Sequence, residues 1–259
     1  MGLAEPNRNE LGPKTGMQTF QSAKLETLET ILQEASSVAL DWCARRGELS
    51  VDEKSLGQFA TNVDIELEKL IRQSLSKHFR GTAIIGEEFG GSLSDGQSGW
   101  AIDPIDGTTN FILGLPIWGI SIGYIENGRS IAGAISLPEL GIALSAAEGT
   151  GLRILSGSAL NPPGAPQVNT MSIGENDFEP GPATDARAQA FRDQDYSVVR
   201  YRCAVFSLAM AALGRLSGYI EHGCGLWDIA AAEIICREAG LQVHTFEIAP
   251  GRFAIDAQW

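Results

Sequence analysis

Apolar residues recur at three- and four-residue steps near the start of the chain, which predicts a long amphipathic helix. We expect this helix from Ser22 to Arg46, ended by Gly47. A polar stretch from Glu48 to about Ala60 predicts a loop, and further apolar periodicity predicts a second helix from Val63 to His78. The apolar stripe of the first helix comprises Leu25, Leu28, Leu32, Ala35, Ala39 and Trp42.

Beyond these helices, the pattern changes to short apolar stretches separated by turn residues. A strand at Ala83–Ile85 is broken by Gly86-Glu87-Glu88, and further short stretches follow from Trp100 onward. Asn127-Gly128 lies between two of them and is a strong hairpin signal, so we expect a largely antiparallel sheet. Five prolines between residues 156 and 185 predict a surface loop or a connection between subdomains.

Helical periodicity returns near the end of the chain. It predicts helices from Val205 to Leu216 and from Asp228 to Ala239, with Gly240 at the position of a C-terminal cap. Helices, then a sheet, then alternating elements indicate an α+β layered sandwich with two subdomains.

Length and composition suit one globular domain of 259 residues, of which 44% are hydrophobic and 20% charged. Residues 1–17 lack periodicity and are expected to be a mobile leader before a single domain at 18–259. An α+β subdomain is expected at about 18–150 and an α/β subdomain at about 151–259. With no apolar run of about 18 residues and no hydrophobic signal core, the sequence predicts a soluble, cytoplasmic protein.

The charge balance is acidic, because 19 Lys and Arg against 32 Asp and Glu give a net charge of −13. Such a surface repels the phosphates of nucleic acids and membranes, so neither is an expected partner. A small phosphorylated substrate meets the same repulsion unless cations neutralise it. The cysteines form no C-x-x-C motif, so we expect small buried hydrophobic residues rather than disulfides or a zinc site at Cys43, Cys203, Cys224 and Cys236.

The segment Trp100–Asn110 (WAIDPIDGTTN) carries the most informative chemistry, because an apolar strand stops there in a turn rich in oxygen ligands. Asp103 and Asp106 project from one tight loop, and Gly107 leaves its own amide and that of Thr108 free to face an anion. Oxygen ligands without His or Cys suit a hard cation such as Mg²⁺. Considered alone, however, the segment also fits a solvated turn.

Three other carboxylates lie at the ends or starts of predicted elements, and each also has a purely structural interpretation. Glu87 follows a strand and could be an exposed loop acid, while Asp228 begins a helix and could be its N-cap. Thr61-x-x-Asp64 fits a capping box. Their joint occurrence with the Asp103–Thr108 loop favours a functional interpretation.

At this point the chain resembles the inositol monophosphatase family of Mg²⁺-dependent, lithium-sensitive phosphatases, from about residue 20 to the end. Its two signature motifs are similar to Trp100–Phe111 (WAIDPIDGTTNF) and Trp227–Gly240 (WDIAAAEIICREAG), with Ile85–Glu88 and Thr61–Asp64 as supporting blocks. The resemblance implies a layered αβαβα sandwich of the inositol monophosphatase and fructose-1,6-bisphosphatase type. It also implies a phosphate monoesterase that uses metal-activated water, and commonly a homodimer.

Residue by residue, the resemblance implies two to three Mg²⁺ ions. The first ion would be held by Glu87, Asp103 and the Ile105 carbonyl. The second would be held by Asp103, Asp106 and Asp228. A third, weaker ion would be bound by Glu87 through water. Thr108, supported by Asp64, would with Glu87 position and deprotonate the attacking water. The residues implied to bind substrate are Asp106, Gly107, Thr108, Glu221 and Asp228.

The resemblance leaves the substrate open. It points first to myo-inositol 1-phosphate, but Cys203, Ala204 and Val205 replace the small residues that family members place against the inositol ring. Gly86–Gly90 is similar to the histidinol phosphatase branch, so histidinol phosphate and other sugar or nucleotide phosphates stay alternatives. Gln58 occupies the place of a frequent family Asp.

Two function classes other than a phosphatase are also suggested. Gly119-x-Ser121-x-Gly123 fits the nucleophile elbow of serine hydrolases, but the hairpin that follows it lacks the required strand–turn–helix context. Some bacterial relatives associate with transcription machinery, so a binding protein with dispensable catalysis is a further alternative.

The three histidines lack metal-ligand spacing and are expected to be structural or surface groups: His78, His222 and His244.

Overall fold

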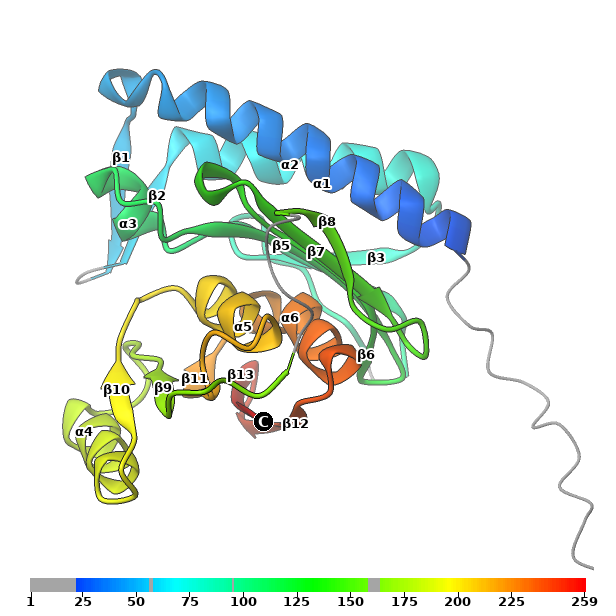
Figure 1. The fold of residues 1–259 in the computed structure, drawn as a ribbon. Helices are drawn as coiled ribbons and strands as arrows, with labels where there is room; N and C mark the ends of the chain where they lie inside the picture. Colours follow the sequence, from blue (N-terminus) through cyan, green and yellow to red (C-terminus); the bar gives the residue numbers. More distant parts are fainter. Residues whose placement is uncertain (1–21, 56–57, 95, 158–163) are drawn as a thin grey trace, which may run out of the picture.

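The computed structural model describes residues 22–55, 58–94, 96–157 and 164–259, and the expected leader at residues 1–17 lies outside them. Helices and sheets alternate in layers (Figure 1), which confirms the predicted αβαβα sandwich. Within the described ranges, no helix combines the length and the apolar character needed to cross a membrane. The helices are α1 (Ser22–Cys43), α2 (Asn62–His78), α3 (Thr108–Leu113), α4 (Gly181–Arg192), α5 (Ala204–Ala212) and α6 (Leu226–Ala239).

A six-stranded sheet forms the centre of the first half, with α1 and α2 on one face. Only β3 and β4 pair in parallel, so the prediction of a largely antiparallel sheet is confirmed. The predicted hairpin is confirmed too, because Asn127 and Gly128 have φ values of 52° and 72°, as a two-residue β-turn requires. In order, the strands are β3 (Ala83–Gly86), β4 (Gly99–Asp106), β5 (Gly119–Glu126), β6 (Arg129–Leu137), β7 (Ile142–Ala147) and β8 (Arg153–Ser156).

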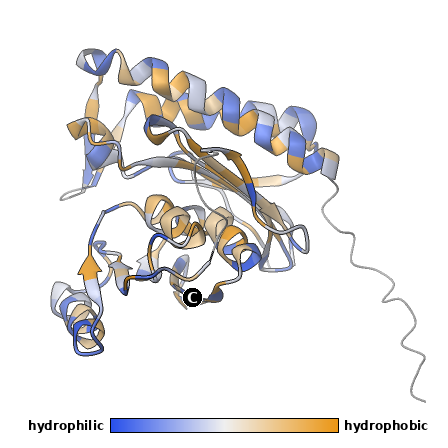
Figure 2. Cartoon of the chain, viewed as in Figure 1, coloured by the Kyte–Doolittle hydropathy of each residue, from blue (hydrophilic) through white to orange (hydrophobic). Residues whose placement is uncertain are grey.

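The second half contains a five-stranded sheet, and α5 and α6 lie between it and the first sheet (Figure 1). These two helices are largely apolar, whereas α1 is polar on its outer side (Figure 2). That difference is expected for helices covered on both sides. In sheet order, the strands are β10 (Ser197–Val199), β9 (Thr170–Ile173), β11 (Gly218–Cys224), β13 (Arg252–Gln258) and β12 (Gln242–Ala249).

Close packing of α6 on the first sheet positions the start of that helix. A Cβ atom added at Gly133 would lie 2.6 Å from backbone atoms of Ala231, so a larger residue would push the helix away. The helix ends at Gly240, whose φ of 106° confirms the predicted C-terminal cap. Its first turn, with Asp228, therefore lies beside β4 and β5.

Two sequence predictions about loops were wrong. The stretch from Glu48 to Ala60 contains the antiparallel strands β1 (Val51–Ser55) and β2 (Gln58–Thr61). Residues 51–54 are exposed, so the strand buries no apolar face that a periodic pattern could reveal. The proline-rich stretch at 156–185 contains β9 and the start of α4, where Pro182 occupies the first turn, a position at which helices tolerate proline.

Candidate active site

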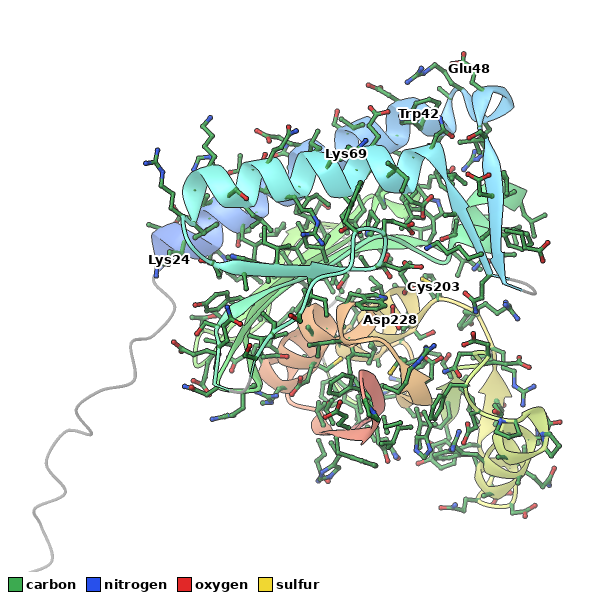
Figure 3. The ribbon with its side chains drawn as sticks, turned by 180° about the vertical axis from the view of Figure 1, so that it is seen from behind. Lys24, Trp42, Glu48, Lys69, Cys203 and Asp228 are labelled. Atoms are coloured by element: carbon green, nitrogen blue, oxygen red, sulfur yellow. The ribbon has the colours of Figure 1, made fainter. Side chains whose placement is uncertain are left out.

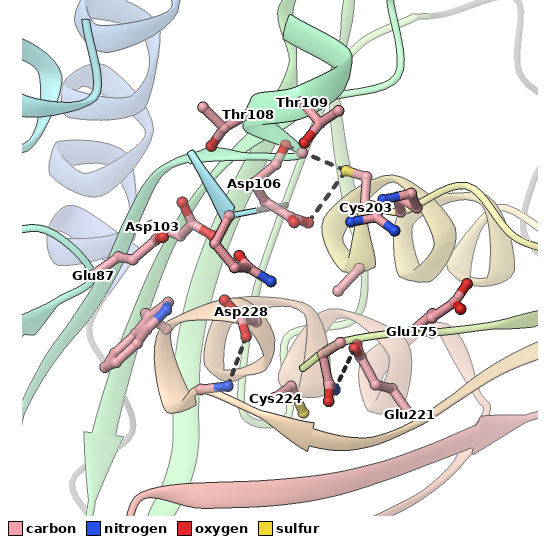
Figure 4. Close-up of a pocket in the computed structure, with 18 of the residues that line it drawn as sticks. Glu87, Asp103, Asp106, Thr108, Thr109, Glu175, Cys203, Glu221, Cys224 and Asp228 are labelled. Atoms are coloured by element: carbon pink, nitrogen blue, oxygen red, sulfur yellow. Dashed lines mark hydrogen bonds between the residues drawn. The ribbon is translucent and has the colours of Figure 1, made fainter. Parts of the chain in front are cut away.

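Acidic side chains from separate elements line one pocket of about 340 Å³ (Figure 4). It lies between the two halves of the molecule, where Cys203 and Asp228 are labelled in Figure 3. The structure thus brings the predicted residues together, with Asp64 just behind Thr108. The predicted residues that line the pocket are Glu87, Asp103, Ile105, Asp106, Gly107, Thr108, Glu221 and Asp228.

The end of β4 presents two carboxylates to the pocket because its pairing with β5 is irregular between Asp103 and Asp106. The Asp103 carboxylate accepts a hydrogen bond from the Ile105 amide at 3.0 Å, which fixes the loop from inside. Gly107 follows with φ of 86°, and a Cβ atom there would lie 2.9 Å from the Ile117 carbonyl oxygen. The glycine therefore lets the chain turn sharply into α3.

Asp64 forms the capping box expected from the sequence and also contacts Thr108. It closes the capping box of α2 by accepting hydrogen bonds from the Thr61 amide at 2.8 Å and hydroxyl at 2.5 Å. Its other oxygen lies 3.2 Å from the Thr108 hydroxyl, which is also 3.0 Å from the Ile105 carbonyl oxygen. The single Thr108 proton can serve only one of these acceptors at a time, so this hydroxyl can change partner.

An ion pair on α2 between the half-buried Arg72 and the buried Glu68 holds the loop that carries Glu87, and sequence reasoning missed it. Glu68 accepts hydrogen bonds from the Glu88 amide at 2.7 Å and from Arg72 Nε at 2.7 Å. Arg72 also donates to the Gly90 carbonyl at 2.6 Å. The i,i+4 spacing of Glu68 and Arg72 was visible in the sequence, but their contact with a loop about twenty residues away was not.

Lys54, on the β1–β2 hairpin, is a second residue that sequence reasoning did not place in the site. Its ammonium group lies 3.1 Å from Glu87 and 2.5 Å from Glu88. Because the hairpin had been interpreted as a loop, nothing in the sequence pattern brought this cation to the pocket.

The cysteines are free, and Cys203, Cys224 and Cys236 are buried as expected, whereas Cys43 is half-buried. Cys203 does more than fill space, because its thiol caps α5 and lies 3.2 Å from the Asp106 carboxylate. The same carboxylate oxygen accepts a hydrogen bond from the Val205 amide. One side of Asp106 is thus fixed by the segment that departs from the family motif.

Asp228 and Glu221 complete the far wall of the pocket (Figure 4). Asp228 accepts a hydrogen bond from the Gly225 amide at 2.6 Å. Gly225 is the N-cap of α6 and Asp228 its third residue, so the interpretation of Asp228 as the N-cap itself is wrong, although its carboxylate does help to close the cap. Glu221 is buried in β11, where Asn176 donates to it at 2.8 Å and Tyr219 donates to its other oxygen.

Burial raises the pKa of the Asp103 carboxyl well above its usual range, and the charges of Glu87, Asp106, Asp228 and Asp64 raise it further. Burial and neighbouring acids likewise raise the pKa of Asp228. Carboxylates gathered this closely out of water destabilise one another unless a cation joins them. The donor set is all oxygen, which fits Mg²⁺.

The carboxylates approach from different elements without converging on one point. In the described part of the chain, no three His, Cys, Asp or Glu side chains form a ready-made chelate.

In the metal-free protein, the free energy of unfolding should fall as the pH rises from about 4 to about 8. Burial raises the pKa of Asp64 from 3.8 to about 7, so the folded state holds this proton more tightly than the unfolded chain. That stability is present below pH 3.8 and is lost as the pH rises through 7, by at most about 4 kcal/mol. The measurement is denaturant unfolding in a chelator across this pH range. For Asp64→Asn, the free energy of unfolding should fall less with rising pH than it does for wild type. Asp41→Asn, which removes an exposed carboxylate near the end of α1, should match wild type.

Ser121, the candidate nucleophile of a serine hydrolase, and His222 both have structural contacts. Ser121 is buried within β5 and donates to the Trp227 carbonyl at 3.1 Å, so the nucleophile elbow is absent at this motif. His222 lies 2.8 Å from Arg187 and 3.5 Å from Glu179, outside the pocket lining.

Comparisons with known proteins identify the family and the fold. The sequence model of the inositol monophosphatase family matches residues 21–254. The inositol-1-monophosphatase SuhB of Mycobacterium tuberculosis is 33% identical over 71% of this chain and 67% of its own. The Nus factor SuhB of Xylella fastidiosa is 31% identical over 88% of this chain and 84% of its own. The solved structure of Mycobacterium tuberculosis SuhB superposes with a TM-score of 0.73 at 29% identity, covering 92% of this chain and 91% of that one.

Proposed function

The chain belongs to the inositol monophosphatase family of metal-dependent phosphatases, and we propose that it is a Mg²⁺-dependent phosphomonoesterase acting on small polyol phosphates such as myo-inositol 1-phosphate. The observation that carries the proposal is one pocket that joins Glu87, Asp103, Asp106 and Asp228 to the Thr108–Asp64 pair. We further propose a cytoplasmic homodimer.

Two to three Mg²⁺ ions would be held by Glu87, Asp103, the Ile105 carbonyl, Asp106 and Asp228. When bound, Mg²⁺ lowers the pKa of water and stabilises charge on the phosphoryl and leaving oxygens. The burial of these acids supports the assignment, since a cation removes the repulsion that raises their pKa values.

The remaining steps belong to side chains and amides of the chain. The Thr108 hydroxyl, which donates to Asp64 at 3.2 Å, orients the attacking water together with Glu87. The one proton that this water loses passes to Glu87, and the leaving alkoxide oxygen takes up one proton in turn. The amides of Gly107 and Thr108 contact the phosphate at the start of α3. Glu221, held by Asn176, receives a substrate hydroxyl.

A substrate panel tests this proposal. Phosphate release should be measured with Mg²⁺ on inositol 1-phosphate, fructose 1,6-bisphosphate, histidinol phosphate and 3′-phosphoadenosine 5′-phosphate. We expect the two polyol phosphates to have the higher kcat/KM values, because Glu221 and Asp106 offer carboxylate acceptors to hydroxyl groups. Faster hydrolysis of histidinol phosphate would support the Gly86–Gly90 alternative, and no hydrolysis of any substrate would favour a binding protein.

A further inference from the structure

Three cationic side chains line the pocket, and two of them already have partners. Lys54 lies 3.1 Å from Glu87, and Arg252 donates to the Gly223 carbonyl at 3.0 Å. Arg202 is exposed, and its guanidinium makes no hydrogen bond or ion pair with any residue that the structure describes. In a chain of net charge −13, such a cation is available to an anionic ligand.

Two further acids that line the pocket have arginines other than Arg202 as cationic neighbours. Glu175 lies 3.8 Å from Arg200, and Asp177 lies 3.8 Å from Arg252. Both acids line the pocket, and Glu175 is labelled at its edge in Figure 4. Neither acid forms an ion pair with Arg202.

The backbone at Arg202 adopts a left-handed conformation, which is unfavourable for an arginine. In the described part of the chain, three non-glycine residues have positive φ: Asn127, Asp195 and Arg202, the last with φ of 53°. Asn and Asp adopt this conformation comparatively easily, whereas an arginine does so at a cost. Strain of this kind gathers at ligand-binding positions.

Contacts on both sides hold Arg202 in this conformation. Asn110 donates to the Tyr201 carbonyl at 2.8 Å, and the Cys203 thiol lies 3.2 Å from Asp106. Both anchors belong to the segment that carries the pocket carboxylates. The position of Arg202 is thus coupled directly to the site that would hold the phosphate.

We propose that Arg202 binds a second anionic group of the substrate, so that the preferred substrate is a polyol phosphate bearing an additional carboxylate or phosphate. A guanidinium presents paired donors that match either group bidentately. This inference rests on the proposed phosphatase function and narrows its substrate class.

Matched substrate pairs test the inference. The first pair is glycerol 3-phosphate and 3-phosphoglycerate, which adds a carboxylate; the second is inositol 1-phosphate and inositol 1,4-bisphosphate, which adds a phosphate. The preference is the ratio of kcat/KM with and without the second anion. We expect wild type to prefer the second anion in at least one pair, and Arg202→Gly to reduce that preference about tenfold, mainly through KM.

Two further variants separate charge from structure. Arg202→Lys keeps the charge without the paired donors and should retain an intermediate preference, while Arg192→Gln, which removes an exposed cation from α4, should match wild type. Arg202→Gly should unfold at a temperature no lower than wild type, because glycine relieves the positive φ.

The outcomes distinguish this inference from the proposed function. Hydrolysis with no preference in either pair, or an equal loss on both members of a pair in Arg202→Gly, would overturn the role of Arg202 and leave the phosphatase intact. Failure of every substrate with Mg²⁺ would overturn the proposed function itself, and the inference with it.

Discussion

Replacing Asp103 by Asn should lower Mg²⁺-dependent kcat/KM by about a thousandfold or more. Asp103 is buried at the end of β4 and lines the pocket, and we propose that it contacts two of the metal ions, so its loss should weaken the site that stabilises the transition state. Metal ions supply several kcal/mol of this stabilisation, and each 1.4 kcal/mol changes the rate about tenfold. The measurement is steady-state release of phosphate over a range of Mg²⁺ concentrations.

The same substitution should stabilise the metal-free protein. Burial and four neighbouring acids raise the pKa of Asp103. At a pH where this carboxyl is ionised in the unfolded chain, it therefore lowers the stability of the folded protein. The amide of Asn keeps an acceptor for the Ile105 amide and removes the charge. We therefore expect Asp103→Asn to have a larger free energy of unfolding than wild type in a chelator at pH 8, measured by denaturant titration.

Asp185→Asn is the matched control, because it removes a carboxylate that is 71% exposed on α4. This control should change neither the activity nor the stability of the metal-free protein in the way that Asp103→Asn does. Near wild-type activity of Asp103→Asn, or lower stability without metal, would show that Asp103 is not part of a cation-binding acidic cluster.

The site could be predicted from the sequence where its chemistry is contiguous. Asp103, Asp106, Gly107 and Thr108 come from one loop, and Asp228 lies in the first turn of a helix with clear periodicity. Local physical chemistry identified these residues as candidates, and the resemblance of the two motifs to the inositol monophosphatase family implied their roles.

The residues that support the site could not be predicted, because their contacts join distant parts of the chain. Glu68 holds the Glu88 amide across twenty residues, and Cys203 meets Asp106 across 97 residues. Tertiary packing determines such contacts, and the periodicity of hydrophobic residues along the sequence does not predict them. The β1–β2 hairpin was missed for a related reason, since β1 exposes side chains on both faces.

The structural and functional interpretations of the acids also turned out to be compatible. Asp64 and Asp228 each close a helix cap and still face Thr108 or the pocket. A cap holds a carboxylate in a fixed orientation, so the structural role positions the group for chemistry.

The acidic pocket implies that the cation must bind before the phosphate. In their ionised forms, Glu87, Asp103, Asp106 and Asp228 repel a phosphate dianion, and each pair of unit charges about 4 Å apart costs about 4 kcal/mol near a protein surface. Lys54 is already paired with Glu87 and Glu88 and compensates little of this charge.

The most direct test is calorimetric titration of the wild-type protein with inorganic phosphate, in saturating Mg²⁺ and again after chelation. We predict measurable binding with Mg²⁺ and an affinity at least about a hundredfold lower without it. Equal affinity in the two titrations would contradict a metal-dependent phosphatase site in this pocket.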